Sequence, residues 1–256
     1  MPKRISKVTW LIRLHKRCSR IYNSGSMKPT FLIAAVVVCL GARAETTPNT
    51  IQDVVARMDR AAVSFQAMRA NVNYLTHTAV IDDDTKESGS VLMRKVPPNE
   101  VQGRIDFVLP DPRTVTFEQR KAQVYYPKIK TLQIYDLGDK GEQLDRFLMI
   151  GFGTSGTELA KEYGMRVVSS EQIKGQTAIK LELLPKSADI RNVVTKIEMW
   201  IPEVGDPYPV QEKIYEKSPG DFRLINYSEV QLNPKLKPDA LKLKLPSGVK
   251  TVTPQK

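Results

Sequence analysis

The sequence has 256 residues and a formal net charge of +11, and this charge is concentrated at the N-terminus. Residues 1–44 carry nine Lys or Arg and no acid, so subtracting nine from +11 leaves only +2 for residues 45–256. A nearly neutral body disfavours a nucleic-acid-binding domain, and we expect no nucleic-acid partner. Both cysteines precede residue 45, and His77 is the one histidine beyond it, which excludes a Cys/His zinc site there.

Residues 1–44 are predicted to be a leader that ends in a signal peptide. Lys28 precedes an apolar core at residues 31–40, and Ala42-Arg43-Ala44 follows it. This is the small-residue pattern that a signal peptidase reads, so we expect cleavage after Ala44. The core is about half of the ~20 apolar residues that a membrane-spanning helix needs. Residues 1–26 have two interpretations, an early start codon or a long basic segment; an uncleaved anchor is a further alternative.

Residues 51–70 carry the one long helical pattern. Its apolar residues recur at steps of three and four, and Thr50 with Asp53 supplies a plausible N-terminal cap; the apolar positions are Ile51, Val54, Val55, Met58, Ala62, Phe65 and Met68.

Beyond residue 71 the chain alternates apolar and polar residues in short runs joined by polar turns. Each run has one apolar side, as in residues 177–184, where Ile179 and Leu181 alternate with Lys180 and Glu182. About eleven such strands in succession predict an antiparallel sheet with one wet face, and so large a sheet tends to curl. We therefore predict a mainly β (α+β) fold for residues 45–256 as a single domain. It is an unclosed antiparallel barrel whose N-terminal helix and short helices form a lid.

A glycine motif, G-x-G-x-x-G, occupies Gly151, Gly153 and Gly156, with Glu171 twenty residues after the first glycine. A dinucleotide-binding fold needs several parallel strands that alternate with helices, and only one such unit is available here. We therefore expect no cofactor. The glycines more simply allow a turn between two short helices, over residues 144–150 and 157–163, which cover the mouth of the barrel.

Other candidate sites are weak. Asp82-Asp83-Asp84 lacks the glycine and the distal glutamate of a calcium loop, so an acidic turn is favoured and no metal is expected. A hydrolase would need a nucleophile and a base, and with His77 alone we expect no enzyme.

Several stretches together resemble one known family. They are the signal peptide with the N-terminal helix, "SGSVLMRKVPPNEVQGRIDFVLP", "VYYPKIKTLQIYDL" and the ending from "KIEMWIPEVGDPYPVQEKIYEKSPGDF" to "LPSGVKTV". Their order is similar to that of the periplasmic outer-membrane lipoprotein carriers, the LolA-like proteins. Three features depart from the family: Gln119-Arg120-Lys121 stands where the family often has Asp-Gly, Val96 separates the basic pair from Pro97, and residues 137–165 are longer and richer in glycine.

The resemblance implies a half-barrel that shields acyl chains of lipoproteins or other lipids on their way to the outer membrane. It implies a periplasmic location in a diderm bacterium, an inner-membrane donor complex, an outer-membrane acceptor, and Arg94 and Lys95 in contact with the lid. We expect a monomer. The alternative is a sensor of lipids or lipoproteins with the same fold. Strand and helix parity predicts that the lipid cavity is lined by Val55, Met58, Phe65, Ile105, Phe107, Val115, Phe117, Leu132, Ile134, Phe147, Met149, Phe152, Ile179, Leu181, Ile197 and Met199.

Overall fold

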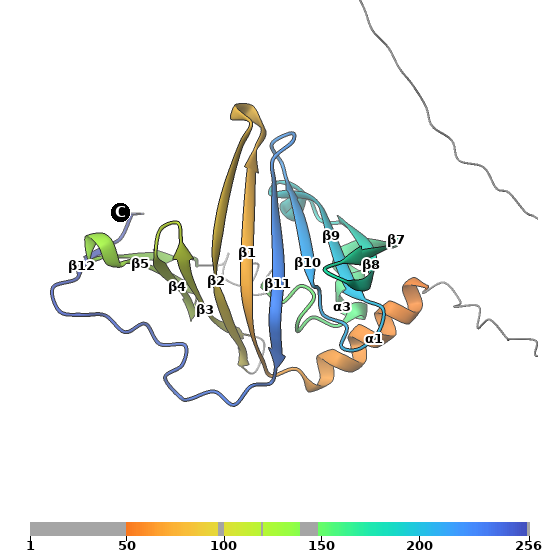
Figure 1. Cartoon of the computed structure of the whole chain (residues 1–256), viewed down its shortest axis with the longest axis horizontal. Helices are drawn as coiled ribbons and strands as arrows, with labels where there is room; N and C mark the ends of the chain where they lie inside the picture. The colour runs from red at the N-terminus through yellow and green to blue at the C-terminus, as the bar shows by residue number, and fades with distance from the viewer. Residues whose placement is uncertain (1–49, 97–99, 119, 139–147, 255–256) are drawn as a thin grey trace, which may run out of the picture. The chain divides into compact units, whose positions relative to one another are not determined.

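The computed structural model describes residues 50–254 except 97–99, 119 and 139–147 (Figure 1). The described residues belong to one compact unit, Thr47–Lys256. The predicted signal peptide and the predicted cavity residue Phe147 lie outside the described residues.

Within the described ranges, twelve strands form one sheet in the order β12-β6-β5-β4-β3-β2-β1-β11-β10-β9-β8-β7. The strands are β1 (Ala67–Thr78), β2 (Asp83–Val96), β3 (Glu100–Leu109), β4 (Arg113–Glu118), β5 (Lys121–Tyr126), β6 (Thr131–Asp136), β7 (Tyr163–Ile173), β8 (Gln176–Pro185), β9 (Val194–Pro202), β10 (Gln211–Glu216), β11 (Phe222–Leu232) and β12 (Lys250–Val252). The helices are α1 (Ile51–Ser64), α3 (Gly156–Glu162) and α4 (Ala188–Arg191), and the 3₁₀ turns are η1 (Ala79–Ile81) and η2 (Pro127–Ile129).

The sheet is antiparallel except at one edge, where β12 pairs in parallel with β6. The first strand, β1, pairs with β11, so an early and a late part of the chain lie side by side near the centre of the sheet. The sheet begins at β12 and ends at β7, and these strands do not pair with each other. The predicted unclosed antiparallel sheet is therefore confirmed, with β12 as a strand that returns along the far edge after β11 (Figure 1).

Helix α1 begins where the sequence predicts it. The Thr50 hydroxyl accepts a hydrogen bond from the Asp53 amide at 3.2 Å, and the Asp53 carboxylate accepts one from the Thr50 amide at 3.0 Å. These reciprocal bonds satisfy two backbone donors at the start of the helix. The Thr50 hydroxyl also donates to the Asp53 carboxylate at 2.6 Å, and this bond, followed by that of the Thr50 amide, lowers the pKa of Asp53. One turn apart on the same side, Val54 and Met58 are buried against the sheet and α3.

The predicted helix over residues 51–70 was too long, because α1 ends at Ser64. Met68, Ala70 and Val72 are buried at every second position and belong to β1, which pairs on both sides with β2 and β11. The Asn233 side chain fixes the turn before β1: its oxygen accepts from the Gln66 amide at 2.7 Å, and its amide donates to the Ser64 carbonyl at 2.8 Å. Sheet pairing on both sides outweighs the local helical pattern.

The main core lies between α1, α3 and the face of β8–β11 that they cover, which we call the inner face. Its buried residues are Val54, Met58, Ile150, Leu159, Tyr163, Ile179, Leu181, Leu183, Val194, Ile197, Met199, Ile201, Ile214 and Ile225. A second cluster covers the inner face of β1–β3 and contains Phe65, Met68, Ala70, Val72, Val91, Met93, Val101, Met149 and Phe152. The segment at residues 149–152 thus contributes to both clusters.

The opposite, outer face of β8–β10 carries a ladder of alternating charges. The Lys180 amine lies 3.3 Å from Glu198, and the Lys196 amine lies 2.9 Å from Glu198 and 3.7 Å from Glu182. Trp200 donates from its ring nitrogen to Glu171 at 2.7 Å. Polar and ionic partners on one face and a packed core on the other confirm the predicted one-sided strands.

No helix in the described ranges combines the length and the apolar character needed to cross a bilayer.

Candidate functional site

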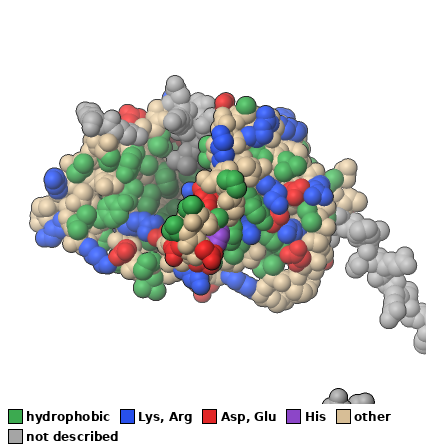
Figure 2. Space-filling model, turned by 90° about the horizontal axis from the view of Figure 1, so that it is seen from above, with side chains coloured by type: hydrophobic (Ala, Val, Ile, Leu, Met, Phe, Trp, Pro, Cys, Tyr) green, Lys and Arg blue, Asp and Glu red, His purple; other side chains and the backbone are tan. Residues whose placement is uncertain are grey.

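The inner face of β3–β5 is mainly apolar apart from Arg113, and its side chains range from buried, as for Phe107, to half-buried. Ile105 on β3 pairs with Val115 on β4, and Val115 pairs with Val124 on β5. Residues that pair directly across antiparallel strands point to the same side of the sheet. These three valine and isoleucine side chains and Phe117 are half-buried, whereas those of β8 and β9 are fully buried. Figure 2 shows hydrophobic side chains gathered around a hollow on its left side.

Two predicted cavity residues lie on the other side of the sheet. The partner of Val124 on β6 is Gln133, so Leu132 and Ile134 point to the outer face. Leu132 is buried there, next to its partner Tyr125. Grouping Leu132 and Ile134 with Val115 was therefore wrong, because the strand pairing shifts β6 by one residue from the assumed parity.

A buried loop, residues 149–154, sits on the inner face, and we call it the plug. The Met149 carbonyl accepts hydrogen bonds from the amides of Phe152, Gly153 and Thr154, each at 3.1 Å. Met149, Ile150 and Phe152 are buried. The Phe152 ring packs edge-on against Tyr227 of β11, with the ring centres 4.9 Å apart. The plug is therefore a self-contained turn whose apolar side chains seat on the sheet.

All three motif glycines serve close packing around the plug. A Cβ at Gly151 would lie 2.7 Å from Pro209, and this glycine has a φ of +79°. A Cβ at Gly153 would lie 2.9 Å from Phe65, and one at Gly156 would lie 2.7 Å from the Val55 Cα. Helices α1 and α3 can therefore touch backbone to backbone, so the motif is a packing device.

The short helices around the motif are placed as follows. The helix predicted over residues 157–163 is α3, which starts at Gly156 with Ser155 as its cap. The helix predicted over residues 144–150 lies mostly outside the described residues.

Asp59 of α1 accepts hydrogen bonds from the Thr157 amide at 2.8 Å and the Thr157 hydroxyl at 2.7 Å, which lower the pKa of Asp59.

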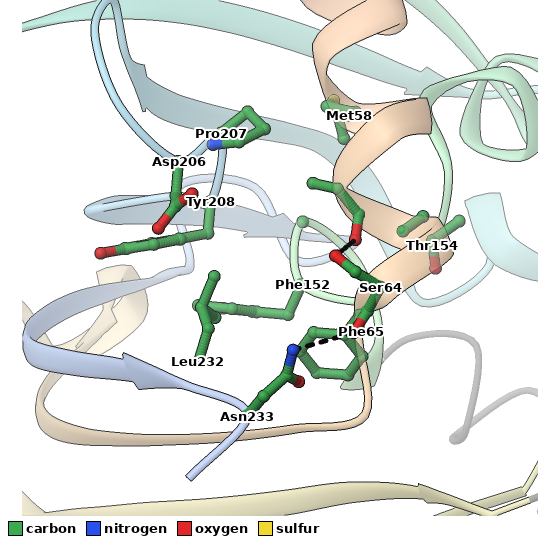
Figure 3. Close-up of a pocket in the computed structure, with 13 residues that line it drawn as sticks. Met58, Ser64, Phe65, Phe152, Thr154, Asp206, Pro207, Tyr208, Leu232 and Asn233 are labelled. Carbon is green, nitrogen blue, oxygen red and sulfur yellow. Dashed lines mark hydrogen bonds between the residues drawn. The ribbon is translucent and has the colours of Figure 1, made fainter.

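The space beneath α1 is largely filled by side chains. A pocket of about 60 Å³ remains between the end of α1, the plug and the loop before β10 (Figure 3). Ligand pockets for drug-sized molecules are about 300–1,000 Å³. Phe65, Phe152, Tyr208 and Leu232 surround this pocket in Figure 3. The further lining residues are Met58, Ala61, Ala62, Ser64, Gly151, Thr154, Asp206, Pro207 and Asn233.

The structure divides the predicted cavity residues into three groups. Ile179, Leu181, Ile197 and Met199 are fully buried in the main core under α1 and are not exposed to the pocket. A second group consists of Met149 and Phe152 in the plug and of Met58 and Phe65 beside it, while Val55 faces Gly156. The third group shares the inner face of β3 and β4 and consists of Ile105, Phe107, Val115 and Phe117.

Arg94 and Lys95, the two residues expected to contact the lid, have different positions in the structure. Met93 belongs to the inner cluster, so its neighbour Arg94 lies on the outer face, where its guanidinium donates to the Gln102 side chain. The Lys95 amide donates to the Gln66 carbonyl just after α1, at 2.8 Å. Among the described contacts, the Arg94 side chain therefore joins strands β2 and β3, and the predicted contact with the lid was wrong for this residue.

A carboxyl group is buried under the plug. Glu212 of β10 lies on the inner face between its cross-strand partners Met199 and Ile225, and it is 6% exposed. The Tyr227 hydroxyl donates to its Oε2 at 3.1 Å, and its Oε1 has no hydrogen-bond partner among the described residues. Burial raises the pKa of Glu212 from 4.5 to about 8, against the smaller opposing effect of Tyr227. The acid is therefore mostly neutral at pH 7.

Sequence analysis missed Glu212, although the strand pattern contains a signal. In β10, Glu212 and Ile214 occupy the buried positions, and Gln211, Lys213 and Tyr215 occupy the alternate ones. An acid at an apolar position of an alternating strand is the kind of local conflict that marks a functional or strained site.

No family model matches this chain, and no curated protein matches it by sequence. Solved structures with a similar fold include an uncharacterized conserved protein from Thermus thermophilus, with 14% identity, a TM-score of 0.49, and coverage of 79% of this chain and 98% of that one. A LolA superfamily protein from Nitrosomonas europaea has 13% identity, a TM-score of 0.41, and coverage of 76% and 98%. MucB has 13% identity, a TM-score of 0.46, and coverage of 76% and 62%.

Replacing Gly156 with alanine is expected to loosen α1 and α3. The added Cβ meets the Val55 backbone at 2.7 Å, so the helices must separate, and we expect a loss of about 1–3 kcal/mol in the free energy of unfolding. Gly164→Ala is the control, because its Cβ would meet only the Leu184 carbonyl at 3.8 Å. Urea unfolding measures both variants. Equal stability of the two variants would contradict the close contact.

Glu212→Gln is expected to stabilise the fold at neutral pH and to change its pH dependence. Because the folded-state pKa of Glu212 is about 8, the native protein keeps a proton that the unfolded chain loses between pH 4.5 and 8. The wild type therefore loses stability relative to the variant as pH rises through that window, reaching about 3 kcal/mol at pH 7. Urea unfolding at pH 5, 7 and 8.5 tests this. Parallel stability curves for the two proteins would show that Glu212 is ionised in the fold.

Proposed function

We propose that this protein is a periplasmic carrier that binds acyl chains of lipoproteins or other lipids on the inner face of its open sheet. The observation that carries the proposal is the half-buried apolar surface of Ile105, Val115, Phe117 and Val124, which continues into a plug made of apolar side chains. Each methylene group withdrawn from water contributes about 0.8 kcal/mol, so such a surface favours an alkyl chain. The proposed role needs no catalytic group.

Release of the guest needs a cover that competes with it. The backbone hydrogen bonds described for the plug end on the Met149 carbonyl, within the plug itself. The plug contacts the sheet through apolar side chains, as Phe152 does with Tyr227. A guest that replaces these contacts breaks no backbone hydrogen bond between plug and sheet among those described. The guest would therefore compete with the plug for the same apolar contacts, as a carrier requires.

The proposed route follows from the predicted signal peptide and from the resemblance to LolA-like carriers. The protein would be exported, would receive its guest from an inner-membrane complex, and would deliver it to an outer-membrane acceptor. A sensor with the same binding surface would hold the guest and pass on no cargo, so a transfer assay between inner-membrane and outer-membrane vesicles separates the two roles.

The exported protein is expected to co-purify with acyl chains, and Val115→Arg is expected to reduce their amount at least about tenfold, because a guest would then bury a charge. Val80→Arg is the matched control, since Val80 is 88% exposed in η1. Native mass spectrometry of the proteins purified from the periplasm measures the bound lipid. Lipid-free wild-type protein, or equal loading of the two variants, would count against the proposal.

A further inference from the structure

Glu212 is the buried polar group directly beneath the plug. Its Oε1 faces Gly151, since a Cβ built on that glycine would lie 3.2 Å from this oxygen. This Oε1 is buried without a hydrogen-bond partner among the described residues, while Oε2 accepts from Tyr227. Leaving a buried polar atom unpaired destabilises a fold, so the position of Glu212 indicates a role other than folding.

The surroundings of Glu212 connect it to the open part of the inner face. Across the sheet, Glu212 pairs with Ile225, and Ile225 pairs with Tyr74. The Tyr74 ring lies 5.6 Å from that of Phe107 on β3. Ring and alkyl side chains therefore lead from β3 to Glu212, with the Arg113–Glu87 ion pair beside the Phe107 ring, and the plug covers the end of this path.

We propose that Glu212, oriented by Tyr227, is the polar anchor for the ester or amide carbonyl of an acylated guest that takes the place of the plug. This inference rests on the proposed function and specifies the chemistry of the same site. The neutral acid accepts from the Tyr227 hydroxyl through Oε2, so its own proton on Oε1 is available for a carbonyl oxygen.

Chemistry favours a carbonyl over a charged headgroup. The raised pKa of Glu212 keeps the carboxyl protonated at pH 7, and a neutral donor suits a neutral acceptor in an apolar site. An alkyl chain supplies affinity along the sheet, and the carbonyl supplies the hydrogen bond that the closed protein leaves unmade. The anchor would therefore discriminate an acyl chain from a plain alkyl chain of equal length.

The test compares methyl palmitate with hexadecyl methyl ether, which has a similar chain and no carbonyl. Displacement of a fluorescent fatty-acid probe from the full exported protein gives both affinities. We expect the wild type to prefer the ester about five- to tenfold, the discrimination that one net hydrogen bond supplies. Glu212→Leu should reduce this ratio to about one, whereas Glu212→Gln, which keeps a donor, should retain most of it.

Glu198→Leu is the matched control, because Glu198 is a buried carboxylate on the outer face of the neighbouring strand β9. It should keep the preference of the wild type. Equal affinity of the wild type for ester and ether, or an unchanged preference in Glu212→Leu, would overturn the anchor alone. If the wild type binds neither compound, the proposed function itself fails.

A measurement without any variant covers the case in which Glu212→Leu does not fold. The carbonyl stretch of ¹³C-labelled methyl palmitate bound to the wild type should move to lower frequency than in hexane, because a hydrogen bond weakens the C=O bond. A bound ester whose stretch matches that in hexane would overturn the anchor.

Discussion

The arrangement of this protein depends on the packing of one apolar loop and one amphipathic helix against the inner face of an open sheet. A sheet of this width must bury most of its apolar face, and α1, α3 and the plug cover the inner face of β7–β11 and part of that of β1–β3. The same physical force that seats the plug would also seat an alkyl chain. Folding and binding therefore use one surface, and the plug and a guest are alternatives.

The inner side chains are buried to different extents in the two halves of the sheet. Under α1 the side chains of β8 and β9 are fully buried, and about 60 Å³ of space remains at the end of that helix. On β3–β5 the inner side chains of Ile105, Val115, Phe117 and Val124 are half-buried. The hollow expected beneath the first helix is thus mostly filled, and the apolar surface open to a guest lies further along the sheet. The proposed role is unchanged, but the proposed binding surface lies on β3–β5 and not beneath α1.

The sequence alone predicted the class of fold, because apolar residues alternate with polar or charged ones along β8 and β9. It also predicted the start of α1 from Thr50 and Asp53. It failed where tertiary pairing decides: Met68 continues a helical pattern but lies in a strand, and Ile134 faces outward because β6 pairs one residue out of the assumed parity. Glu212 was missed although it alternates with Ile214 in β10, because the sequence does not show that its carboxyl lacks a partner on one oxygen. The glycine motif was interpreted correctly as a turn. The reason for Gly156 could not be predicted, because it lies in the tertiary contact of α3 with α1, where a Cβ would clash with Val55.

The central claim is that a guest displaces the plug, and hydrogen–deuterium exchange of the exported protein with and without methyl palmitate tests it most directly. The amides of Phe152, Gly153 and Thr154, which bond to Met149 in the closed protein, are the reporters. The account predicts that these amides exchange faster when lipid is bound, while those of β3 and β4 exchange more slowly. Saturating lipid that leaves the plug amides as protected as before would contradict it.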